Sequence, residues 1–313
     1  MDNILIFGGS GCLGKHLIKK YINTYNIINY SRDEHKHWYI DIEFGKGKIK
    51  HIIGDANNAT IVRNTLIQYN PCKIFIIHAL KHVDRCQDNI DACINTNLLS
   101  VKTILDTVHA FQLNLTNLKE VIFTSTDKAP SPVNAYGMCK ALCEELMINK
   151  SKQIPNIKFL TVRYGNVLNS TGSIIQTLLN SKEDTFYITD IKMTRFWMTI
   201  DDAINTIEYA IYNGESGDII IPKAKSFYVK DLIYYFAKLQ NKKVEISGIR
   251  PGERLYETLI NDTQMQKTIS KDKYYHISPN IINNNNNIEV YDSNTNLITD
   301  KNELEALLVN IIT

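Results

Sequence analysis

The chain has 313 residues, of which 44% are hydrophobic and 22% are charged, and its formal net charge is +2. This length allows two lobes or one large α/β unit, and the composition excludes a disordered or fibrous chain. The near-balanced charge gives no broad electrostatic footprint for nucleic acid or an acidic membrane. We therefore expect a small-molecule substrate and no nucleic-acid partner.

Six cysteines are scattered along the chain: Cys12, Cys72, Cys86, Cys93, Cys139 and Cys143. No two of them form a C-x-x-C pair, so we expect reduced thiols, no disulfide framework and no bound metal. The apolar segment 3–7 breaks into glycines, unlike a signal peptide, and no apolar run is long enough to span a bilayer. The expected location is cytoplasmic, without membrane association.

Short apolar runs alternate with longer helical patterns as far as about residue 165. The runs are 4–7, 27–30, 49–53, 74–77, 121–123 and 159–162. Because they are apolar on both faces, they suit strands of a parallel sheet covered by helices on either side. We predict a doubly wound α/β fold of the Rossmann type, with residues 1–165 as the dinucleotide-binding domain.

Beyond Asn166 this rhythm loosens into polar loops, as expected where insertions build a smaller substrate-binding lobe. We place that C-terminal lobe in residues 166–195 and 223–313, with residues 196–222 returning to the first domain. The asparagine run 283–287 is expected to be a surface loop.

Gly8, Gly11 and Gly14 directly follow the first apolar run and open a helical pattern, which is the context of a dinucleotide fingerprint. A side chain at these positions would obstruct the tight turn or hold a pyrophosphate away from the helix N-terminus. The alternative is a glycine-rich turn without a ligand.

The second strand ends in Tyr30, Ser31 and Arg32, where an NAD-binding unit usually carries an acid. A hydroxyl and a guanidinium suit a ribose 2′-phosphate, so we predict NADP, with NAD left open by Asp33 and Glu34. Asp55 follows the third strand and could accept from the adenine amino group or serve as a turn residue.

Tyr136 and Lys140 lie four residues apart near a helix start, which places both side chains on one face. A lysine near the tyrosine hydroxyl would favour the phenolate and lower the tyrosine pKa. Upstream, the fifth strand ends in the run 125–128, Ser-Thr-Asp-Lys, at the sheet edge where ligands of open α/β sheets bind.

The chain resembles the inverting UDP-N-acetylglucosamine 4,6-dehydratases, which are extended short-chain dehydrogenases/reductases. Besides the glycines, the resemblance rests on these islands: 30–34 (YSRDE), 79–83 (ALKHV), 125–129 (STDKA), 163–167 (RYGNV), 193–197 (MTRFW) and 249–253 (IRPGE). Lys128 is the most discriminating residue, because dehydratases that retain the C5 configuration carry glutamate at this place.

The resemblance implies a reaction sequence on UDP-N-acetylglucosamine. Tyr136 would deprotonate the C4 hydroxyl as hydride passes to the nicotinamide, and Lys128 would remove the C5 proton. Asp127, protonated, would help the C6 hydroxyl leave as water before hydride returns to C6 and C5 is reprotonated from the opposite face. Lys128 must be neutral, and we expect Lys140 and an oxidised nicotinamide to lower its pKa.

The residue patterns and the resemblance together predict the following site residues. The catalytic set is Thr126, Asp127, Lys128, Tyr136 and Lys140. The cofactor set is Gly8, Gly11, Cys12, Leu13, Gly14, Ser31, Arg32, Asp55, Ala79, Tyr136 and Lys140. The substrate set is Lys81, Asn166, Gly172, Ser173, Arg195, Arg250 and Glu253, with His82 bordering the sugar or serving only structure.

Two departures from the family affect this transfer. Thr171 stands where relatives carry arginine, which puts recognition of the phosphates or the N-acetyl group in doubt. Cys139 replaces a common threonine beside Lys140 and keeps a small side chain. UDP-glucose stays open as the sugar, because no residue here can be tied to the N-acetyl group by chemistry alone.

Other functions stay open. A UDP-sugar 4-epimerase or a C5-retaining dehydratase would share the cofactor site and the tyrosine–lysine pair. A non-catalytic NADP-binding regulator would keep only the dinucleotide domain. We also expect a homo-oligomer built on the helix pairing common in short-chain dehydrogenases.

Overall fold

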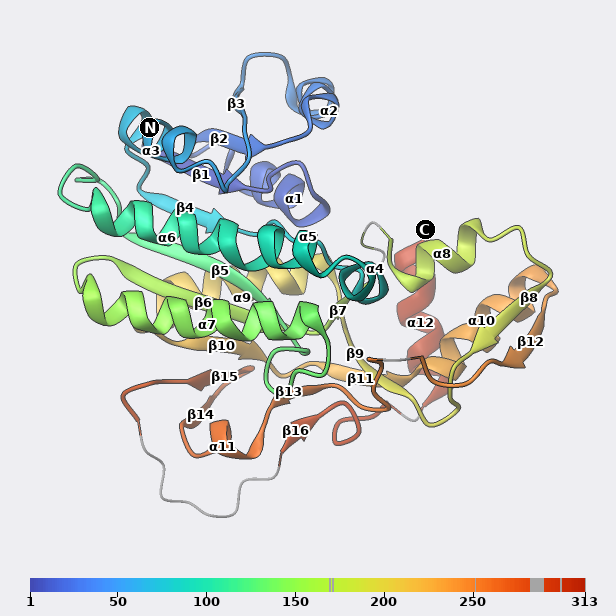
Figure 1. Ribbon diagram of the computed structural model, residues 1–313. Coiled ribbons are helices and arrows are strands. Elements are labelled where there is room, and N and C mark those ends of the chain that lie inside the picture. Colours follow the sequence, from blue (N-terminus) through green and yellow to red (C-terminus); the bar gives the residue numbers. More distant parts are fainter. Residues whose placement is uncertain (169, 171, 251, 282–289, 299, 313) are drawn as a thin grey trace.

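The computed structural model describes residues 1–168, 170, 172–250, 252–281, 290–298 and 300–312. Nine strands in these ranges form one sheet, in the order β14-β15-β10-β6-β5-β4-β1-β2-β3 (Figure 1). Their bounds are β1 (Asn3–Phe7), β2 (Asn26–Ser31), β3 (Ile49–Ile53), β4 (Lys73–Ile76), β5 (Glu120–Thr126), β6 (Lys158–Tyr164), β10 (Ile219–Pro222), β14 (Thr268–Lys271) and β15 (Tyr274–Ile277). The first six strands and β10 run parallel, which confirms the predicted Rossmann sheet, and β15 and β14 add an antiparallel edge.

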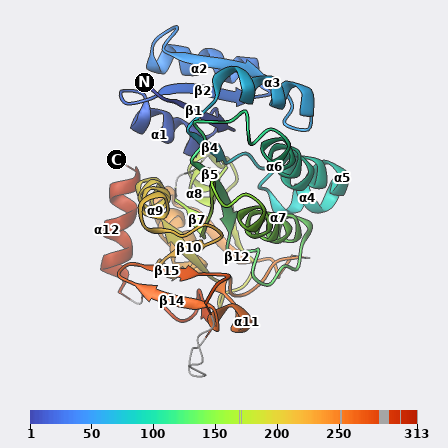
Figure 2. The same ribbon diagram turned by 90° about the vertical axis from the view of Figure 1, so that its left-hand side faces the viewer.

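Helices cover both faces of the sheet, as the edge-on view in Figure 2 shows. On one face lie α3 (Ala59–Tyr69), α6 (Ser100–Ala110) and α7 (Ala135–Gln153), and on the other lie α1 (Cys12–Tyr21) and α9 (Ile200–Asn213). Successive side chains of a strand point to opposite faces of the sheet, so the apolar runs contribute to two separate cores. Phe7 and Phe123 are buried on the α3–α6–α7 face, and Ile6 and Ile122 on the α1–α9 face.

The remaining connections of the first domain are short helices and one π-helical turn. They are α2 (Glu34–Phe44), α4 (Val83–Asp88), α5 (Ile90–Ile94) and the turn η1 (Asn95–Leu99), which leads directly into α6. In this part of the chain, α4 and α5 pack against α7, the helix that carries Tyr136 and Lys140.

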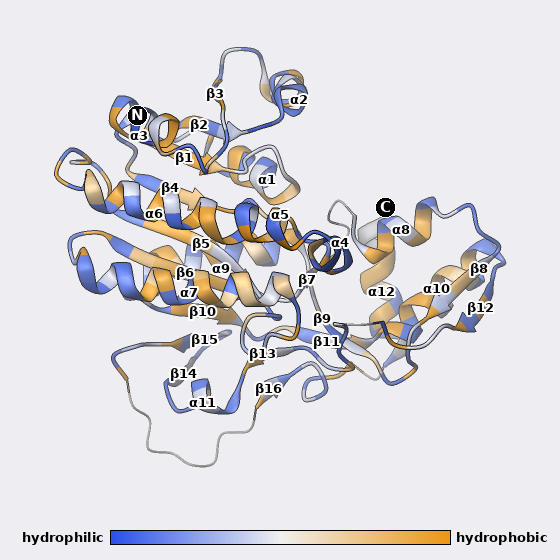
Figure 3. Cartoon of the chain, viewed as in Figure 1, coloured by the Kyte–Doolittle hydropathy of each residue, from blue (hydrophilic) through white to orange (hydrophobic). Residues whose placement is uncertain are grey.

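A smaller lobe lies beyond the carboxyl ends of the parallel strands (Figure 1). Its strands are β7 (Asn166–Val167), β9 (Thr194–Met198) and β11 (Lys225–Tyr228) in one sheet, and β8 (Thr185–Ile188) and β12 (Lys243–Ile246) in another. Its helices are α8 (Ile174–Asn180), α10 (Val229–Gln240) and α12 (Lys301–Ile312). Figure 3 shows apolar residues along α10 and α12, and Leu232, Phe236, Leu304 and Leu308 form part of this lobe's own core.

A third small unit joins the lobe to the sheet. It consists of β13 (Thr258–Ile260), α11 (Asp262–Met265) and β16 (Tyr291–Asp292). Arg163 on β6 reaches this unit, donating to the Leu259 carbonyl at 2.7 Å and the Gln264 side chain at 2.9 Å. The same guanidinium binds both carboxylate oxygens of Glu144 on α7, at 2.9 and 2.6 Å, so one buried arginine connects strand, helix and linking unit.

The structure bears on the predicted boundaries of the smaller lobe and on the prediction that no segment spans a membrane. The segment 196–222 contains α9 and β10, which lie on and in the large sheet, and β14 and β15 extend that sheet from within 223–313. The lobe boundaries stay a prediction, and the asparagine run 283–287 and Thr171 lie outside the described residues. No helix in the described ranges is long and apolar enough to cross a bilayer, and the cytoplasmic location stays a prediction.

Candidate active site

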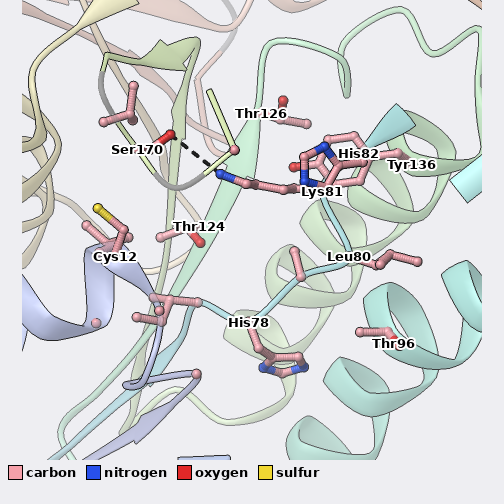
Figure 4. A pocket seen from close by; sticks show the side chains of 18 of the residues that line it. Cys12, His78, Leu80, Lys81, His82, Thr96, Thr124, Thr126, Tyr136 and Ser170 are labelled. Carbon is pink, nitrogen blue, oxygen red and sulfur yellow. Dashed lines mark hydrogen bonds between the residues drawn. The ribbon is translucent and has the colours of Figure 1, made fainter. Parts of the chain in front are cut away.

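A cavity of about 1230 Å³ lies between the carboxyl ends of the parallel strands and the smaller lobe. Every residue predicted above for catalysis, cofactor binding or substrate binding lines this cavity. Figure 4 shows that its wall is built from distant parts of the chain, with Cys12, His78, Lys81, Thr126, Tyr136 and Ser170 around it. The topology explains this convergence, because the strand ends and the loops after them meet at one edge of the sheet.

The glycine turn forms one end of the cavity, between β1 and α1. Gly8 has φ +96°, and a Cβ there would lie 2.8 Å from the backbone nitrogen of His78. A Cβ at Gly14 would lie 2.4 Å from the Cα of Gly9, so α1 could not pack against the turn. Gly11 caps α1 without any side-chain hydrogen bond to the first turn, and α1 has no acidic residue there. The first-turn N–H groups thus face the cavity as an anion cradle, which fits a dinucleotide pyrophosphate.

The end of β2 forms a basic corner of the same cavity. Ser31 Oγ contacts Ser10 Oγ at 3.0 Å, while Arg32 and Lys36 line the wall beside it. Asp33 is the N-cap of α2, accepting from the backbone N–H of Lys36 at 3.2 Å. The carboxylate of Asp33 therefore stabilises the N-terminus of α2.

Asp55 lies across this corner, in the turn after β3. Its Oδ1 accepts from the backbone N–H and the side-chain amide of Asn57, at 2.9 and 3.0 Å. The hydroxyl of Tyr30 donates to the Asp55 carbonyl at 3.0 Å. Asp55 is therefore both a turn residue and a residue of the cavity wall.

The loop after β4 is held by Asn97, a residue that the sequence did not single out. Asn97 lies in the π-helical turn, is fully buried, accepts from the Leu80 N–H at 2.8 Å and donates to the Leu80 carbonyl at 2.9 Å. This two-point clamp fixes the backbone between Ala79 and Lys81, both of which line the cavity. The Lys81 ammonium in turn reaches Ser170 Oγ at 3.5 Å (Figure 4). Burial lowers the pKa of Lys81.

The end of β5 carries a chain of polar contacts at the centre of the cavity. Thr126 Oγ1 donates to Asp127 Oδ1 at 3.0 Å, and Lys128 Nζ donates to the same oxygen at 2.9 Å. Lys128 also lies 3.1 Å from Glu257 Oε1. Burial alone would lower the pKa of Lys128, but the carboxylates of Asp127 and Glu257 outweigh it and the pKa is raised. The expected lowering of this pKa is therefore wrong for these surroundings, because two acids flank the ammonium.

Tyr136 and Lys140 occupy one face of α7, as the i, i+4 spacing predicts, and both are buried. Burial raises the pKa of Tyr136 to about 12, against the opposing effects of Lys128 and of a hydrogen bond with Thr126. Lys140 donates to the Thr124 carbonyl at 2.8 Å and lies over the Phe123 ring, and burial lowers its pKa to about 8. The expected lowering of the Tyr136 pKa by Lys140 is not found, since Lys128 is the cation that acts on it.

Buried polar atoms without partners occur both at the end of β5 and on the lobe side of the cavity. Among the described residues, Ser125 Oγ, Asp127 Oδ2, Asn166 Oδ1 and the indole nitrogen of Trp197 lack hydrogen-bond partners and belong to cavity-lining residues. Such atoms are costly to bury unpaired, so they favour a polar ligand in this space. Trp197 faces Asn166 across the β7–β9 pairing, a neighbour that the sequence did not indicate.

The remaining predicted substrate residues line the cavity in turns. Gly172 has φ +72° and lies against the His82 ring, and Ser173 is the N-cap of α8. The Arg250 backbone N–H donates to Glu253 Oε2 at 3.2 Å. Within the described part of the chain, no group of side chains suited to hold a metal ion occurs.

Arg195, one of the predicted substrate residues, lies among charged groups at the centre of the cavity. Its Nη1 donates to the Thr194 carbonyl at 2.7 Å and the Leu255 carbonyl at 3.2 Å, and its Nε lies 3.6 Å from Glu257 Oε1. Arg195 is 8% exposed and lines the cavity beside the Asp127–Lys128 pair. In this structure it belongs to the charged centre of the site.

Comparison with known proteins agrees with this geometry. A family model described as "Polysaccharide biosynthesis protein" matches residues 4–279. The chain is 34% identical to a UDP-N-acetylglucosamine 4,6-dehydratase (inverting) of Campylobacter jejuni, over 89% of this chain and 83% of the relative. The chain belongs to the polysaccharide biosynthesis family. The resemblance stated from the sequence islands is thereby confirmed, and the protein is an enzyme of the dehydratase and epimerase branch of the short-chain dehydrogenases/reductases.

One further relative and two solved structures are also similar to this chain. A relative from Rickettsia bellii named UDP-glucose 4-epimerase is also 34% identical, over 88% of this chain and 82% of the relative. The X-ray structure of Pen from Bacillus thuringiensis matches with a TM-score of 0.89 and 29% identity, covering 99% of this chain and 97% of Pen. The dTDP-glucose 4,6-dehydratase DesIV of Streptomyces venezuelae shares the fold, with a TM-score of 0.68 and 18% identity over 81% of this chain and 86% of DesIV.

Proposed function

We propose that this enzyme converts UDP-N-acetylglucosamine to a UDP-2-acetamido-2,6-dideoxy-hexos-4-ulose with inversion at C5, using NADP. The observation that carries the proposal is the hydrogen-bonded pair of Asp127 and Lys128, at 2.9 Å, beside Tyr136 in one cavity. Loss of water across C5 and C6 needs a base for a carbon-bound proton and an acid for the departing hydroxyl. An acid and an amine side by side supply both groups.

The roles follow from the chemistry of each group. Tyr136, as the phenolate, accepts the proton of the C4 hydroxyl; the positive charge of Lys128 and the hydrogen bond with Thr126 favour this form against the burial that raises the tyrosine pKa. Oxidation at C4 gives a ketone that acidifies the C5 proton, which Lys128 removes. Asp127 protonates the C6 oxygen, so that it leaves as water. A nicotinamide cofactor, when bound, supplies the reversible two-electron redox chemistry that this sequence requires.

NADP is favoured over NAD by the basic corner at the end of β2. Arg32 and Lys36 line the cavity there, and Asp33, which lines it too, caps α2 and pairs with Lys36 Nζ at 3.3 Å. A ribose 2′-phosphate carries negative charge and accepts hydrogen bonds, so it complements a guanidinium and an ammonium. The glycine turn would hold the pyrophosphate of the same cofactor.

The UDP end of the substrate would lie toward the smaller lobe. Lys81 and Arg250 line that part of the cavity as cations for a diphosphate, and the unpaired Asn166 and Trp197 groups offer neutral hydrogen bonds. The relatives named for UDP-sugars support a substrate of this class. UDP-glucose is the alternative sugar within it.

The second candidate is a UDP-sugar 4-epimerase, which the names of the Rickettsia relatives favour. An epimerase returns hydride to C4 on the other face of the sugar, so it needs Tyr136 but has no acid–base step at C5 and C6. To separate the two, purified protein is incubated with UDP-N-acetylglucosamine and with UDP-glucose without added cofactor. We expect proton NMR to show a C6 methyl group from the first sugar, whereas a C4 epimer without that methyl group would support the epimerase.

A homo-oligomer is part of the proposal. The outer face of α6 and α7 carries an apolar groove of about 500 Å³ that includes Leu98, Leu99, Leu142, Leu146 and Ile148. Leu99 and Leu142 are 40% and 53% exposed, which favours burial of this face against a second copy. Light scattering on the wild type and on Leu142→Glu tests it, and we expect an oligomer that the glutamate weakens. A monomeric wild type would exclude the expected helix pairing.

A further inference from the structure

The strongest unassigned feature of the site is Glu257, which no sequence motif marked. Glu257 is 4% exposed, and its Oε1 lies 3.1 Å from Lys128 Nζ and 3.6 Å from Arg195 Nε. It precedes β13, so it comes from the unit that links the two lobes, whereas Lys128 follows β5 of the main sheet. A buried carboxylate this close to the Lys128 ammonium interacts with it strongly and so affects where the protons of the Asp127–Lys128 pair lie.

The backbone of Glu257 is fixed by a second buried residue. Its N–H donates to Ser293 Oγ at 3.0 Å, and its carbonyl accepts from the Ser293 N–H at 2.8 Å. Ser293 Oγ also contacts Thr194 Oγ1 at 2.7 Å, next to Arg195 on β9. Ser293 therefore connects the backbone of Glu257 to the strand that carries Arg195, and both side chains lie near Lys128.

The titratable groups that interact with Lys128 come from four separate parts of the chain. Asp127 lies at the end of β5, Tyr136 on α7, Arg195 on β9 and Glu257 before β13. With both acids ionised, the two carboxylates balance the ammonium and the guanidinium. Burial raises the pKa of Glu257, while Lys128 and Arg195 oppose that effect.

We propose that Glu257 is a positioning residue that holds the Lys128 amine against Asp127 and, together with Arg195, keeps the charge of this buried cluster constant while one proton moves between Lys128 and Asp127. This inference rests on the proposed dehydration. It assigns Glu257 no contact with the sugar, because its carboxylate acts through Lys128.

The proton balance shows why such a partner is useful. Transfer along the existing hydrogen bond turns the Lys128 ammonium and the Asp127 carboxylate into an amine and a carboxylic acid, with no net change of charge. The amine then takes the C5 proton, and the acid gives its proton to the C6 oxygen as the C6–O bond breaks and water leaves. Both groups end in their starting states, while Glu257 stays ionised beside Arg195 throughout.

The pH dependence carries the signature of this arrangement. The Asp127–Lys128 pair is competent when it holds one proton, so activity falls at low pH when the pair gains a second proton. At high pH Lys140, whose pKa is about 8, loses its proton before Lys128, whose pKa is raised, so the acid limb is the one that reports on the pair. The negative charge of Glu257 favours protons on the pair, and the positive charge of Arg195 disfavours them. Removing Glu257 therefore moves the acid limb to lower pH, and removing Arg195 moves it to higher pH.

The test measures kcat and KM of dehydration against pH for the wild type, Glu257→Gln, Glu257→Asp and the exposed control Glu245→Gln. We expect Glu257→Gln to shift the acid limb of the kcat profile downward by about one pH unit or more. The aspartate keeps the charge, so its acid limb stays near the wild-type position, and the control matches the wild type. A uniform loss of kcat in Glu257→Gln with an unmoved acid limb would reduce Glu257 to a structural residue and overturn the proposal.

Arg195→Gln supplies the opposite test should Glu257→Gln not fold. Its acid limb is expected to move to higher pH, and an unchanged or lower acid limb would contradict the charge balance. The activity of the wild type distinguishes a failure of the proposed dehydration from a failure of the role given to Glu257. A wild type that forms no 4-keto-6-deoxy sugar removes the proposed function, whereas an active wild type with an unshifted Glu257→Gln profile removes only the role of Glu257.

Discussion

Lys128 and Asp127 are consecutive residues whose side chains meet, with Nζ of the lysine donating to Oδ1 of the aspartate at 2.9 Å. Neighbours in an extended strand point to opposite faces, so this contact depends on the turn that follows β5. The turn places an amine and a carboxyl group at one point of the cavity, close to Tyr136.

The proposed base can be tested without removing its charge. In Lys128→Arg, the guanidinium keeps the ion pairs with Asp127 and Glu257 but cannot become neutral at accessible pH. We expect kcat for dehydration to fall by about 10²–10⁴-fold, with cofactor binding and the unfolding midpoint close to those of the wild type. Lys50→Arg, at an exposed position on β3, is the matched control. Retention of more than a tenth of the activity in Lys128→Arg would exclude lysine as the base.

The cofactor preference can be tested at Arg32. We expect Arg32→Ala to weaken NADP binding by about 10–100-fold, because a charge-assisted hydrogen bond to the 2′-phosphate is worth about 1.5–3 kcal/mol. Binding of NAD, which has no such phosphate, should change little. Fluorescence titration with both dinucleotides, alongside the exposed control Arg63→Ala, gives the answer. Equal losses for the two cofactors would place Arg32 elsewhere than at the 2′ position.

His78 predicts a specific acid sensitivity of the fold. Burial, with a smaller effect from Lys140, lowers the pKa of His78 to about 4 from an ordinary value of 6.5. The unfolded chain then binds more protons between these values, so stability is complete above pH 6.5 and is lost as the pH falls toward 4. At pH 5 the cost is on the order of 2 kcal/mol.

Urea unfolding at pH 7 and pH 5 measures that sensitivity. The difference between the two pH values should shrink in His78→Gln by about this amount, while the exposed His35→Gln should keep the wild-type difference. An unchanged pH dependence in His78→Gln would mean that this imidazole titrates normally in the folded protein.

The buried Arg163–Glu144 pair should dominate the stability of the junction between the sheet and the linking unit. Both residues are buried, and the guanidinium also serves the Leu259 carbonyl and Gln264. We expect Arg163→Met to cost about 3–5 kcal/mol, because it leaves a buried carboxylate unpaired. Adding Glu144→Leu should recover part of this loss, since it removes the orphaned charge. Arg63→Met is the surface control in urea unfolding, and a loss below about 1 kcal/mol for Arg163→Met would contradict the interpretation.

The parts of the fold and site that sequence reasoning found are those with local causes. Gly8 and Gly14 are needed for a positive φ and for a close approach within one turn, and both requirements act over a few residues. Tyr136 and Lys140 share a face by helical periodicity alone. The parallel strands were found because apolar runs buried on both faces are a direct consequence of helices on two sides.

The parts that sequence reasoning missed depend on contacts between distant segments. Glu257 reaches the cavity from the unit before β13, and no sequence motif marks it. Trp197 belongs to the island 193–197, but its place opposite Asn166 follows only from the β7–β9 pairing. The pKa of Lys128 was expected to be lowered by Lys140, but the nearer charges are carboxylates, and only the structure shows their distances. Arg195 likewise contacts Glu257. The antiparallel edge strands β15 and β14 carry no pattern that distinguishes them from strands of the lobe.

The most direct test of the central claim is turnover of UDP-N-acetylglucosamine in D₂O without added cofactor, followed by proton NMR and mass spectrometry. The proposal predicts a 4-keto-6-deoxy sugar that carries deuterium at C5, with couplings of the L-arabino configuration. A product of the D-xylo configuration that never passes through the inverted form would contradict the role given to Lys128. Unchanged sugar, or a C4 epimer that keeps its C6 hydroxyl, would contradict the dehydratase assignment itself.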